Sequence, residues 1–407
     1  MGVASMINKR VLHMHPLLSA TVSSLVLVIG ACSAQDGVAA AHRSVAPSPV
    51  PAPFAITEVA KFNEPWAMAF LPDGRLLVTE KAGQLRLLEP GGHVGTVTGV
   101  PSVSYGGQGG MGDIVVHPGF AKNKLVYISY VEADGSGKRG AVVARATLDF
   151  TGNGDGALSD LSVVWRQQPK IDGGGHFGHR IAFGQDGKLW ISSGERQQFD
   201  PAQDMGGNLG KIIRLNDDGS VPNDNPFASQ GGVAAQVWSL GHRNPLGIAF
   251  DGDGRLWEIE MGPRGGDEFN LIERGRNYGW PIVSNGDHYD GRNIPDHSTA
   301  PQFEAPRISW TPVIAPGDFI IYSGDEFPAW KRNAFAAGLA SQALVRIEFD
   351  GTNAREAARY DMGKRIREVE QGPKGDLWLL EDGIGARLLK LSDPSAREPG
   401  SEAAASN

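Results

Sequence analysis

Cysteine is almost absent from this chain, with Cys32 the single one among 407 residues. A lone cysteine excludes an intrachain disulfide framework, so the folded state depends on packing or on bound ions. Positive charge is also scarce, because 38 Lys and Arg against 46 Asp and Glu give a formal charge of −8. No basic stripe is visible, and the sequence therefore does not indicate nucleic-acid binding.

Motifs of several enzyme classes are missing as well. No Gly-x-Ser-x-Gly elbow supports a serine nucleophile, and no His-Glu-x-x-His helix supports a zinc site. A dinucleotide-type glycine pattern occurs at residues 107–112, but it leads into an apolar strand rather than a helix, which argues against nucleotide binding. The glycine-rich turn at 152–156 lacks the glutamate of a calcium loop and predicts a hairpin turn.

Long apolar runs are confined to the N-terminal region. Residues 17–31 are uncharged, mostly apolar and too short to span a membrane comfortably, and they follow Lys9 and Arg10. Residues 1–31 are therefore predicted to be a signal peptide. The run ends in Ile-Gly-Ala-Cys, which resembles a bacterial lipoprotein box and predicts a periplasmic protein that meets the membrane through a lipid anchor at Cys32. The alternative is a soluble secreted protein with an incidental cysteine.

Two segments carry few core-forming residues. Residues 32–53 are rich in Ala, Pro and Ser and predict a tether. Residues 393–407 are polar and predict a disordered tail. The folded domain is therefore predicted over residues 54–392.

Glycine and proline are abundant, at 55 and 26 residues, and they lie at turns along the whole chain. This distribution is typical of many short strands. A strand–turn–strand pattern recurs in six places, of which the fifth is degenerate: 66–78, 113–129, 181–192, 247–257, 319–327 and 367–380. We predict an all-β fold, a six-bladed β-propeller of four-stranded antiparallel blades.

The third of these units is the first candidate for chemistry. A glycine-rich loop with His176 and His179 leads into its first strand, and Glu195 follows its second strand. A base held at a rigid sheet edge beside a loop is suited to catalysis. The alternative is that both histidines are ordinary polar loop residues.

Three other places combine groups that bind ligands. Arg243 and Asn244 stand at the entrance of the fourth unit, and residues 261–268 after it combine free carbonyl groups with carboxylates, which suits Ca²⁺. Arg365 and Arg367 alternate along a strand and are expected to point to one face, which suits a ligand with several carboxylates. The alternative in each case is a solvated surface.

Taken together, six stretches resemble the pyrroloquinoline quinone (PQQ)-dependent soluble aldose sugar dehydrogenases, the glucose/sorbosone dehydrogenase-like family. They are GGQGGMGD (106–113), GGHFGHRIAF (174–183), GNLGKIIRLNDDGSVPNDNPF (207–227), GHRNPLGIAF (241–250), GPRGGDEFNLIERGRNYGWP (262–281) and KRIREVEQGPKGDLWLL (364–380). The resemblance covers nearly the whole predicted domain. It implies oxidation of the anomeric hydroxyl of an aldose to a lactone, with hydride passing to Ca²⁺-bound PQQ and electrons to an external acceptor.

The resemblance also implies roles for individual residues. His176 matches the general base, Glu195 an acidic residue beside it, and Arg243 a residue at the quinone oxygens. The cofactor contacts that it implies are Gln108, His176, Arg243, Asn244, Gly262, Pro263, Arg365 and Arg367. The calcium ligands that it implies are the carbonyl groups of Gly262 and Pro263 and, at a second site, Glu268 with the Tyr278 backbone.

Three positions depart from the family pattern. His179 stands where the motif usually has glycine, and Met261 where better-known members carry Gln or His. Ala340 stands where those members carry a lysine that contacts the cofactor, so the pocket is expected to lose one cation. Two other functions remain open at this point, a calcium-dependent lactonase and a propeller that binds a ligand without catalysis.

Overall fold

The protein is described by a computed structural model covering residues 42–44 and 50–395. Within these residues the fold is all-β, with one short α-helix, α1 (Phe120–Asn123). The five 3-10 turns are η1 (Asp200–Ala202), η2 (Ala228–Gln230), η3 (Ala234–Gln236), η4 (His297–Thr299) and η5 (Pro328–Trp330). No helix in the described part has the length and apolar character needed to cross a bilayer. The predicted signal peptide, the anchor at Cys32 and the disordered tail lie outside the described residues, apart from the first residues of the tail.

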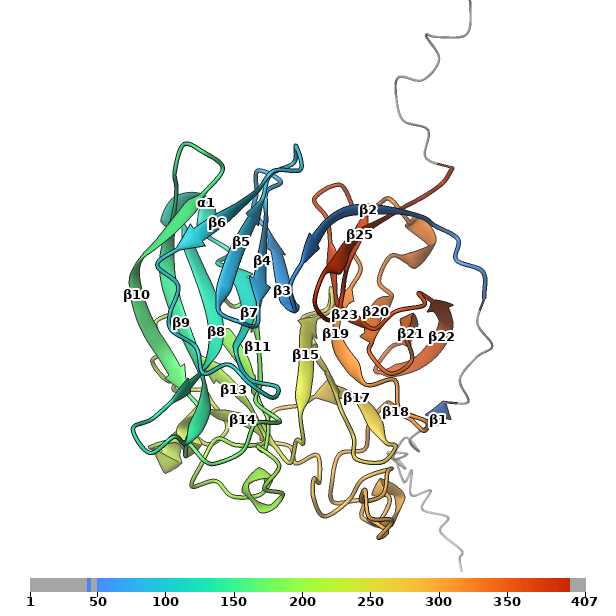
Figure 1. Ribbon diagram of the computed structural model, residues 1–407. Coiled ribbons are helices and arrows are strands. Elements are labelled where there is room, and N and C mark those ends of the chain that lie inside the picture. Colours follow the sequence, from blue (N-terminus) through green and yellow to red (C-terminus); the bar gives the residue numbers. More distant parts are fainter. Residues whose placement is uncertain (1–41, 45–49, 396–407) are drawn as a thin grey trace, which may run out of the picture. The chain divides into compact units, whose positions relative to one another are not determined.

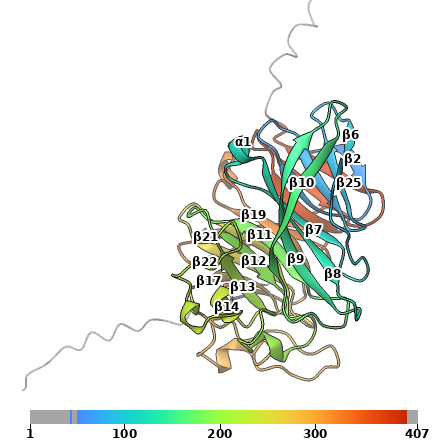
Figure 2. The same ribbon diagram turned by 90° about the vertical axis from the view of Figure 1, so that its left-hand side faces the viewer.

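The largest sheet has eight strands and forms two antiparallel runs of four (Figure 1). The first run is β3 (Pro65–Phe70), β4 (Leu76–Glu80), β5 (Gln84–Leu88) and β6 (Val94–Thr98). The second is β7 (Met111–Val116), β8 (Leu125–Ala133), β9 (Arg139–Phe150) and β10 (Gly156–Arg166). A short parallel pairing of β10 with β6 joins the two runs (Figure 2).

Three further sheets are built from consecutive strands, one of them extended by a strand from the predicted tether. The first contains β11 (Gly178–Phe183), β12 (Leu189–Ser193), β13 (Lys211–Leu215) and β14 (Val237–Leu240). The second contains β15 (Pro245–Phe250), β16 (Leu256–Glu260), β17 (Asp267–Ile272) and β18 (Ile308–Trp310). The third contains β19 (Pro316–Ile321), β20 (Ala334–Gly338), β21 (Ala343–Asp350) and β22 (Asn353–Asp361). The added strand, β1 (His42–Ser44), pairs in parallel with β18.

The last sheet joins the two ends of the folded region. β23 (Ile366–Gln371), β24 (Leu377–Glu381) and β25 (Ala386–Ser392) are completed by β2 (Ala55–Phe62), which pairs antiparallel with β25 (Figure 1). The first strands of successive runs, β3, β7, β11, β15, β19 and β23, contact one another in order, and β23 contacts β3 again. The sheets therefore surround a common axis, with these inner strands next to it.

Apolar clusters fill the spaces between neighbouring sheets. Trp257 and Phe269 pack against Phe319 and Val345 of the next sheet, and Met68 and Val78 pack in the same cluster as Leu380 and Leu388. Central strands such as β4, β12, β13 and β16 are buried along their whole length, because both of their faces are covered by a neighbouring sheet. The turns fit this arrangement, since Gly187 and Gly254 adopt positive φ angles of 73° and 79°, which favour glycine.

Two details differ from the sequence prediction. Five sheets are present in the described residues instead of six separate blades, because the long β9–β10 hairpin extends to the edge of β6. This contact requires glycine, since a Cβ at Gly95 would lie 2.0 Å from the Gly154 carbonyl oxygen. The second strand of the fifth unit begins at Ala334, after a longer connection that contains η5, and not before Phe327 as predicted.

Candidate active site

A pocket of about 300 Å³ lies at the end of the axis where the inner strands begin, and we call it the start pocket. Several residues predicted from the sequence line it together. Its lining includes Trp66, Lys81, Gln108, His179, Asn244, Met261, Arg365, Arg367 and Asp382. Four of the eight predicted cofactor contacts, from different sheets or loops, therefore converge on one cavity.

His176 and Glu195 form a buried pair beside this pocket. His176 Nδ1 lies 2.5 Å from Glu195 Oε1, and the two residues are 6% and 1% exposed. The loop is held close because Gly194 has no side chain, as a Cβ there would stand 2.2 Å from the His176 carbonyl oxygen. Gln108, which lines the start pocket, accepts the His176 backbone N–H through Oε1 at 2.7 Å. The pair is thus fixed directly against the cavity.

The electrostatics of the pair favour a neutral imidazole. Burial lowers the pKa of His176 below its usual value, and this outweighs the opposing effect of the Glu195 hydrogen bond. Burial acts to raise the pKa of Glu195, but the His176 hydrogen bond and the Phe199 backbone N–H bring it below its usual value. Glu195 Oε2 also accepts the backbone N–H groups of Gln198 and Phe199, at 2.5 and 2.7 Å. The arrangement is a neutral base oriented by a carboxylate.

Arg243 and Asn244 are positioned from behind by a carboxylate of β16. Glu260 Oε2 accepts the backbone N–H of Arg243 at 2.6 Å and that of Asn244 at 3.1 Å. Arg243 Nη1 donates to the Met261 carbonyl at 2.9 Å. The Asn244 side chain is 1% exposed, and neither of its polar atoms has a hydrogen-bond partner among the residues that the structure describes. An unpartnered amide in the lining of a pocket marks a place for a polar ligand atom.

Arg365 and Arg367, which also line the start pocket, share one carboxylate. Arg365 Nε donates to Asp382 Oδ2 at 2.8 Å, and Arg367 Nη2 donates to Asp382 Oδ1 at 2.8 Å. Burial acts to raise the pKa of Asp382, but Arg367 and Arg365 bring it below its usual value. Two guanidinium groups against one carboxylate leave an excess of positive charge for an anionic ligand.

The carbonyl groups predicted to bind calcium lie in a second, very small cavity. This cavity is lined by Arg243, Gly262, Pro263, Glu268 and Tyr278, and it shares Met261 with the start pocket. Neither the Gly262 nor the Pro263 carbonyl accepts a hydrogen bond from another described residue. Free, buried carbonyl oxygens are ligands that Ca²⁺ prefers, so these residues fit the ion.

The loop that holds these carbonyl groups is fixed by Asp267. Its two carboxylate oxygens accept the backbone N–H groups of Gly262 and Ala315, at 2.9 and 2.6 Å. Burial raises the pKa of Asp267 to about 7. The buried carboxyl group of Asp267 therefore holds this loop in place, and the loop is not a flexible surface turn.

Glu268 and Tyr278, the predicted second calcium site, meet at a histidine that the sequence did not point to. His297 Nε2 lies 3.0 Å from the Tyr278 carbonyl oxygen, and His297 Nδ1 lies 3.9 Å from Glu268 Oε1. All three residues are buried. The two predicted ligands are therefore close neighbours, with an imidazole beside both.

The floor of the start pocket is a stack of aromatic and cationic side chains. His179 stacks on Trp66 with ring centroids 4.9 Å apart, and the Arg180 guanidinium lies 4.0 Å from the Trp66 ring. Burial lowers the pKa of His179 to about 3, so this histidine stays neutral. Gly112 makes room for it, because a Cβ there would lie 1.9 Å from the imidazole. His179 is therefore a packing residue.

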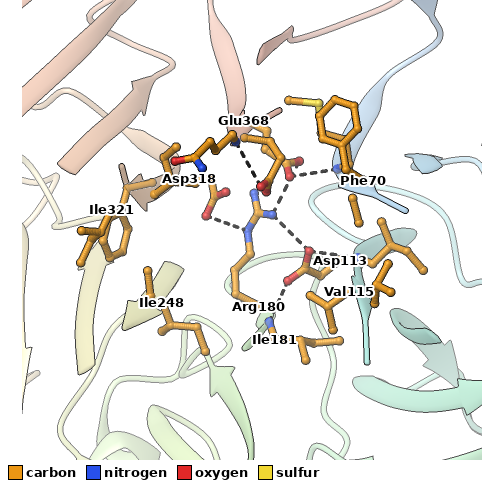
Figure 3. Close-up of a pocket in the computed structure, with 18 of the residues that line it drawn as sticks. Phe70, Asp113, Val115, Arg180, Ile181, Ile248, Asp318, Ile321 and Glu368 are labelled. Carbon is orange, nitrogen blue, oxygen red and sulfur yellow. Dashed lines mark hydrogen bonds and ion pairs between the residues drawn. The ribbon is translucent and has the colours of Figure 1, made fainter. Parts of the chain in front are cut away.

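A larger pocket of about 540 Å³, the end pocket, lies where the inner strands end (Figure 3). Arg180 occupies its centre, with Nη1 3.4 Å from Asp113, Nε 3.6 Å from Asp318 and Nη1 3.7 Å from Glu368. Arg180 also donates to the carbonyl groups of Leu246 and Gly317. The stack of Trp66 on His179, above Arg180, therefore lies between the two pockets.

Several residues of the site were missed by sequence reasoning. Each contacts a predicted residue from a distant place in the sequence: Asp382 contacts Arg367, Glu260 contacts Arg243, and His297 contacts Tyr278. Glu260 also lies within an apolar strand pattern, which hid it further. Lys81, at the turn between β4 and β5, also lines the start pocket. Its ammonium group lies 3.7 Å from Glu64, which lines the same pocket, and no local sequence pattern pointed to either residue.

The fold and the site together define a class of protein: an all-β, propeller-like ring of sheets with a polar pocket on its axis. Within that class, the chain belongs to the Glucose / Sorbosone dehydrogenase family, whose model matches residues 62–390. The proteins of this family are sugar oxidoreductases.

Individual relatives agree with this assignment. The chain is 39% identical over 339 residues to the aldose sugar dehydrogenase YliI of Escherichia coli K12, covering 82% of this chain and 91% of that protein. The apo structure of the soluble aldose sugar dehydrogenase from Escherichia coli matches with a TM-score of 0.78 at 36% identity, covering 84% and 99% of the two chains. The PQQ-bound aldose sugar dehydrogenase from Streptomyces coelicolor matches with a TM-score of 0.69 at 29% identity, covering 85% and 99%.

Proposed function

We propose that the protein oxidises the anomeric hydroxyl of aldose sugars to lactones, with PQQ and Ca²⁺ as cofactors and an external electron acceptor. The observation that carries the proposal is the start pocket, where Gln108, Asn244, Arg365 and Arg367 converge beside the buried His176–Glu195 pair. The solved PQQ-bound relative supports the choice of cofactor.

The residues present suit these cofactors. Arg365 and Arg367 would bind the carboxylates of PQQ, and the unpartnered Asn244 amide would meet a polar atom of the ring system. The free carbonyl groups of Gly262 and Pro263 would hold the calcium ion. When bound, calcium-held PQQ supplies a quinone that accepts a hydride from the anomeric carbon.

The chain itself would supply proton transfer and charge. His176 is engaged with Glu195 through Nδ1, so Nε2 is the nitrogen that would take the proton from the anomeric hydroxyl. Glu195 holds the ring in place and stabilises the imidazolium that forms. Arg243, fixed by Glu260 and the Met261 carbonyl, supplies a permanent positive charge at the same end of the axis.

The proposal extends to a six-bladed architecture. Each of the six inner strands starts an antiparallel run of four strands, if β2 is counted with β23 to β25. The β6–β10 pairing then joins two neighbouring blades at their outer edges. A predicted second calcium ion at Glu268 and the Tyr278 carbonyl would lie beside His297.

Reconstitution tests the proposed function. Apoprotein supplied with PQQ and Ca²⁺ is expected to reduce an artificial dye in the presence of aldoses. Arg365→Ala and Arg367→Ala should each weaken PQQ binding by about 10- to 100-fold, because each removes a charge-assisted hydrogen bond of about 1.5–3 kcal/mol. Arg387→Ala is a matched control, since Arg387 on β25 pairs with Glu381 on β24 and does not line the pocket.

Two other results would contradict the proposal. Lactone hydrolysis without PQQ would indicate the calcium-dependent lactonase. Failure of PQQ to bind, measured by equilibrium dialysis with Ca²⁺ present, would indicate a ligand-binding propeller without this chemistry.

A pH profile tests the role of the His–Glu pair. Glu195 raises the pKa of His176 against the larger, lowering effect of burial. In Glu195→Gln the pKa of His176 should therefore fall further, so the acidic limb of the kcat/KM profile is expected to move to lower pH. The expected kcat is reduced, because an amide does not stabilise the imidazolium. An acidic limb that stays in place or moves to higher pH would argue against this pair.

A further inference from the structure

A cluster of carboxylates lies inside the sheet behind the candidate active site. Glu258 and Glu260 project from β16, and Glu268 and Asn270 from β17. Glu258 and Asn270 are fully buried, and Glu260 and Glu268 are 3% and 7% exposed. Asn270 Nδ2 lies within 3.0 to 3.4 Å of one oxygen of each of the three carboxylates. Three acids therefore share one amide in the protein interior.

No lysine or arginine of the described part of the chain balances these acids. Among the described residues, no lysine or arginine nitrogen lies within 4.0 Å of the three carboxylates, whose ion-pair neighbours are His242 and His297. Such a cluster requires either bound protons or a bound cation, because uncompensated buried charge is costly.

Two buried oxygen atoms point to a cation. Glu258 Oε1 and Asn270 Oδ1 have no hydrogen-bond partner within residues 50–395. One potential ligand atom from each of His242, Glu258 and Glu260 lies within 4.8 Å of the others. His242 reaches Ser239 Oγ through Nε2 at 2.8 Å while Nδ1 faces Glu260 Oε1 at 3.3 Å. Metal-binding histidines commonly have their second nitrogen fixed in this way.

We propose that His242, Glu258, Glu260 and Asn270 form a binding site for a divalent metal cation. Glu258 and Glu260 supply carboxylate oxygens, and His242 supplies an imidazole nitrogen. Asn270 supplies Oδ1 once its amide has rotated, so that Oδ1 takes the place that Nδ2 now occupies beside the carboxylates. The oxygen ligands suit Ca²⁺ or Mn²⁺, and the imidazole suits Zn²⁺. The site is distinct from the carbonyl groups of Gly262 and Pro263, and its ligands do not include Glu268 or Tyr278.

The position of this site gives it a role in shaping the pocket. Glu260 faces the cluster with Oε1, while its Oε2 accepts the backbone N–H groups of Arg243 and Asn244. A cation at Oε1 fixes the same carboxylate that positions these two residues. Cation binding behind the sheet is therefore coupled to the geometry of the start pocket.

Metal binding by the full-length protein, without PQQ, tests this site independently of the proposed function. Protein stripped with a chelator is dialysed against Ca²⁺, Mn²⁺ or Zn²⁺, and bound metal is measured by mass spectrometry. Glu258→Gln should bind one ion fewer per chain than the wild type for the preferred cation. Glu273→Gln, a half-exposed acid just after β17, is the matched control and should bind as many ions as the wild type.

Thermal unfolding gives a second measurement. The preferred cation should raise the Tm of the wild type, and this increase should be lost or strongly reduced in Glu258→Gln. In metal-free buffer the same variant should have the higher Tm, because one of the repelling carboxylates is gone. Asn270→Asp adds an anionic ligand and should show a larger cation-induced increase than the wild type. The proposal is overturned if Glu258→Gln binds as many ions as the wild type with all three metals, or keeps the full increase in Tm.

Discussion

His176→Ala is expected to lower kcat of the protein reconstituted with PQQ and Ca²⁺ by about 10²- to 10⁴-fold, the usual contribution of a positioned general base. Burial keeps the pKa of His176 below its usual value, so the imidazole is neutral and able to accept a proton at pH 7. Glu195 beside it has a pKa below its usual range and is already ionised, which makes it a poor acceptor at that pH. The measurement is dye reduction at saturating aldose.

Two further variants separate loss of the base from loss of packing. His176→Gln retains a side chain that can donate to Glu195 but cannot take up the proton, so it should be nearly as slow as the alanine variant. His93→Ala is the matched control, because His93 is exposed at the turn between β5 and β6 and should leave kcat unchanged. Wild-type kcat in a correctly folded His176→Ala protein would rule out this base.

Arg180→Met is expected to lower the free energy of unfolding at pH 8 by about 3–5 kcal/mol, the cost of breaking a buried ion pair by removing one partner. Arg180 is 3% exposed and lies within 4 Å of Asp113, Asp318 and Glu368 (Figure 3). Methionine fills much of the same volume but leaves these acids without a counterion. Urea unfolding followed by circular dichroism measures the loss.

The loss should depend on pH with a definite sign. Burial raises the pKa of Asp318 to about 7 and raises the pKa of Asp113 and Glu368 even with Arg180 present. Without Arg180 these values rise further, so the folded state binds more protons than the unfolded state. Stability should therefore increase as the pH falls from about 8 towards 5 and decrease as it rises through 7.

A double variant provides the control for this prediction. Arg180→Met with Asp318→Asn removes one of the unpaired acids and should recover part of the stability at pH 8, with a smaller pH dependence. A loss that is equal at pH 5 and pH 8 would show that packing against Trp66, and not charge, is the main contribution of Arg180.

Most of the fold could be predicted because its information is local. Turn glycines such as Gly187 and Gly254 are flanked by short apolar strands, and the structure places β11–β12 and β15–β16 there. The joining of β6 to β10 could not be predicted in this way. It depends on how far the β9–β10 hairpin extends in space, which neither strand encodes by itself.

The site was predictable where a residue's neighbours in sequence are also its neighbours in space. His176 and Glu195 lie at the two ends of one hairpin, so their contact follows from the turn between them. The stretch Trp-Glu-Ile-Glu in β16 behaves differently. Alternation predicts that its acids face solvent, yet Glu258 and Glu260 are buried because a neighbouring sheet covers that face as well. Only tertiary packing reveals this cluster.

The pairing of β2 with β25 has a consequence for synthesis on the ribosome. β2 is among the first strands of the domain to be made, but its partner is completed only at Ser392. Until then the edge of β2 stays without its native hydrogen bonds, and a prematurely terminated chain keeps it exposed to intermolecular pairing. The same adjacency makes this domain a good candidate for circular permutation, with Ser392 linked to Ala55 and new ends opened at an exposed turn elsewhere.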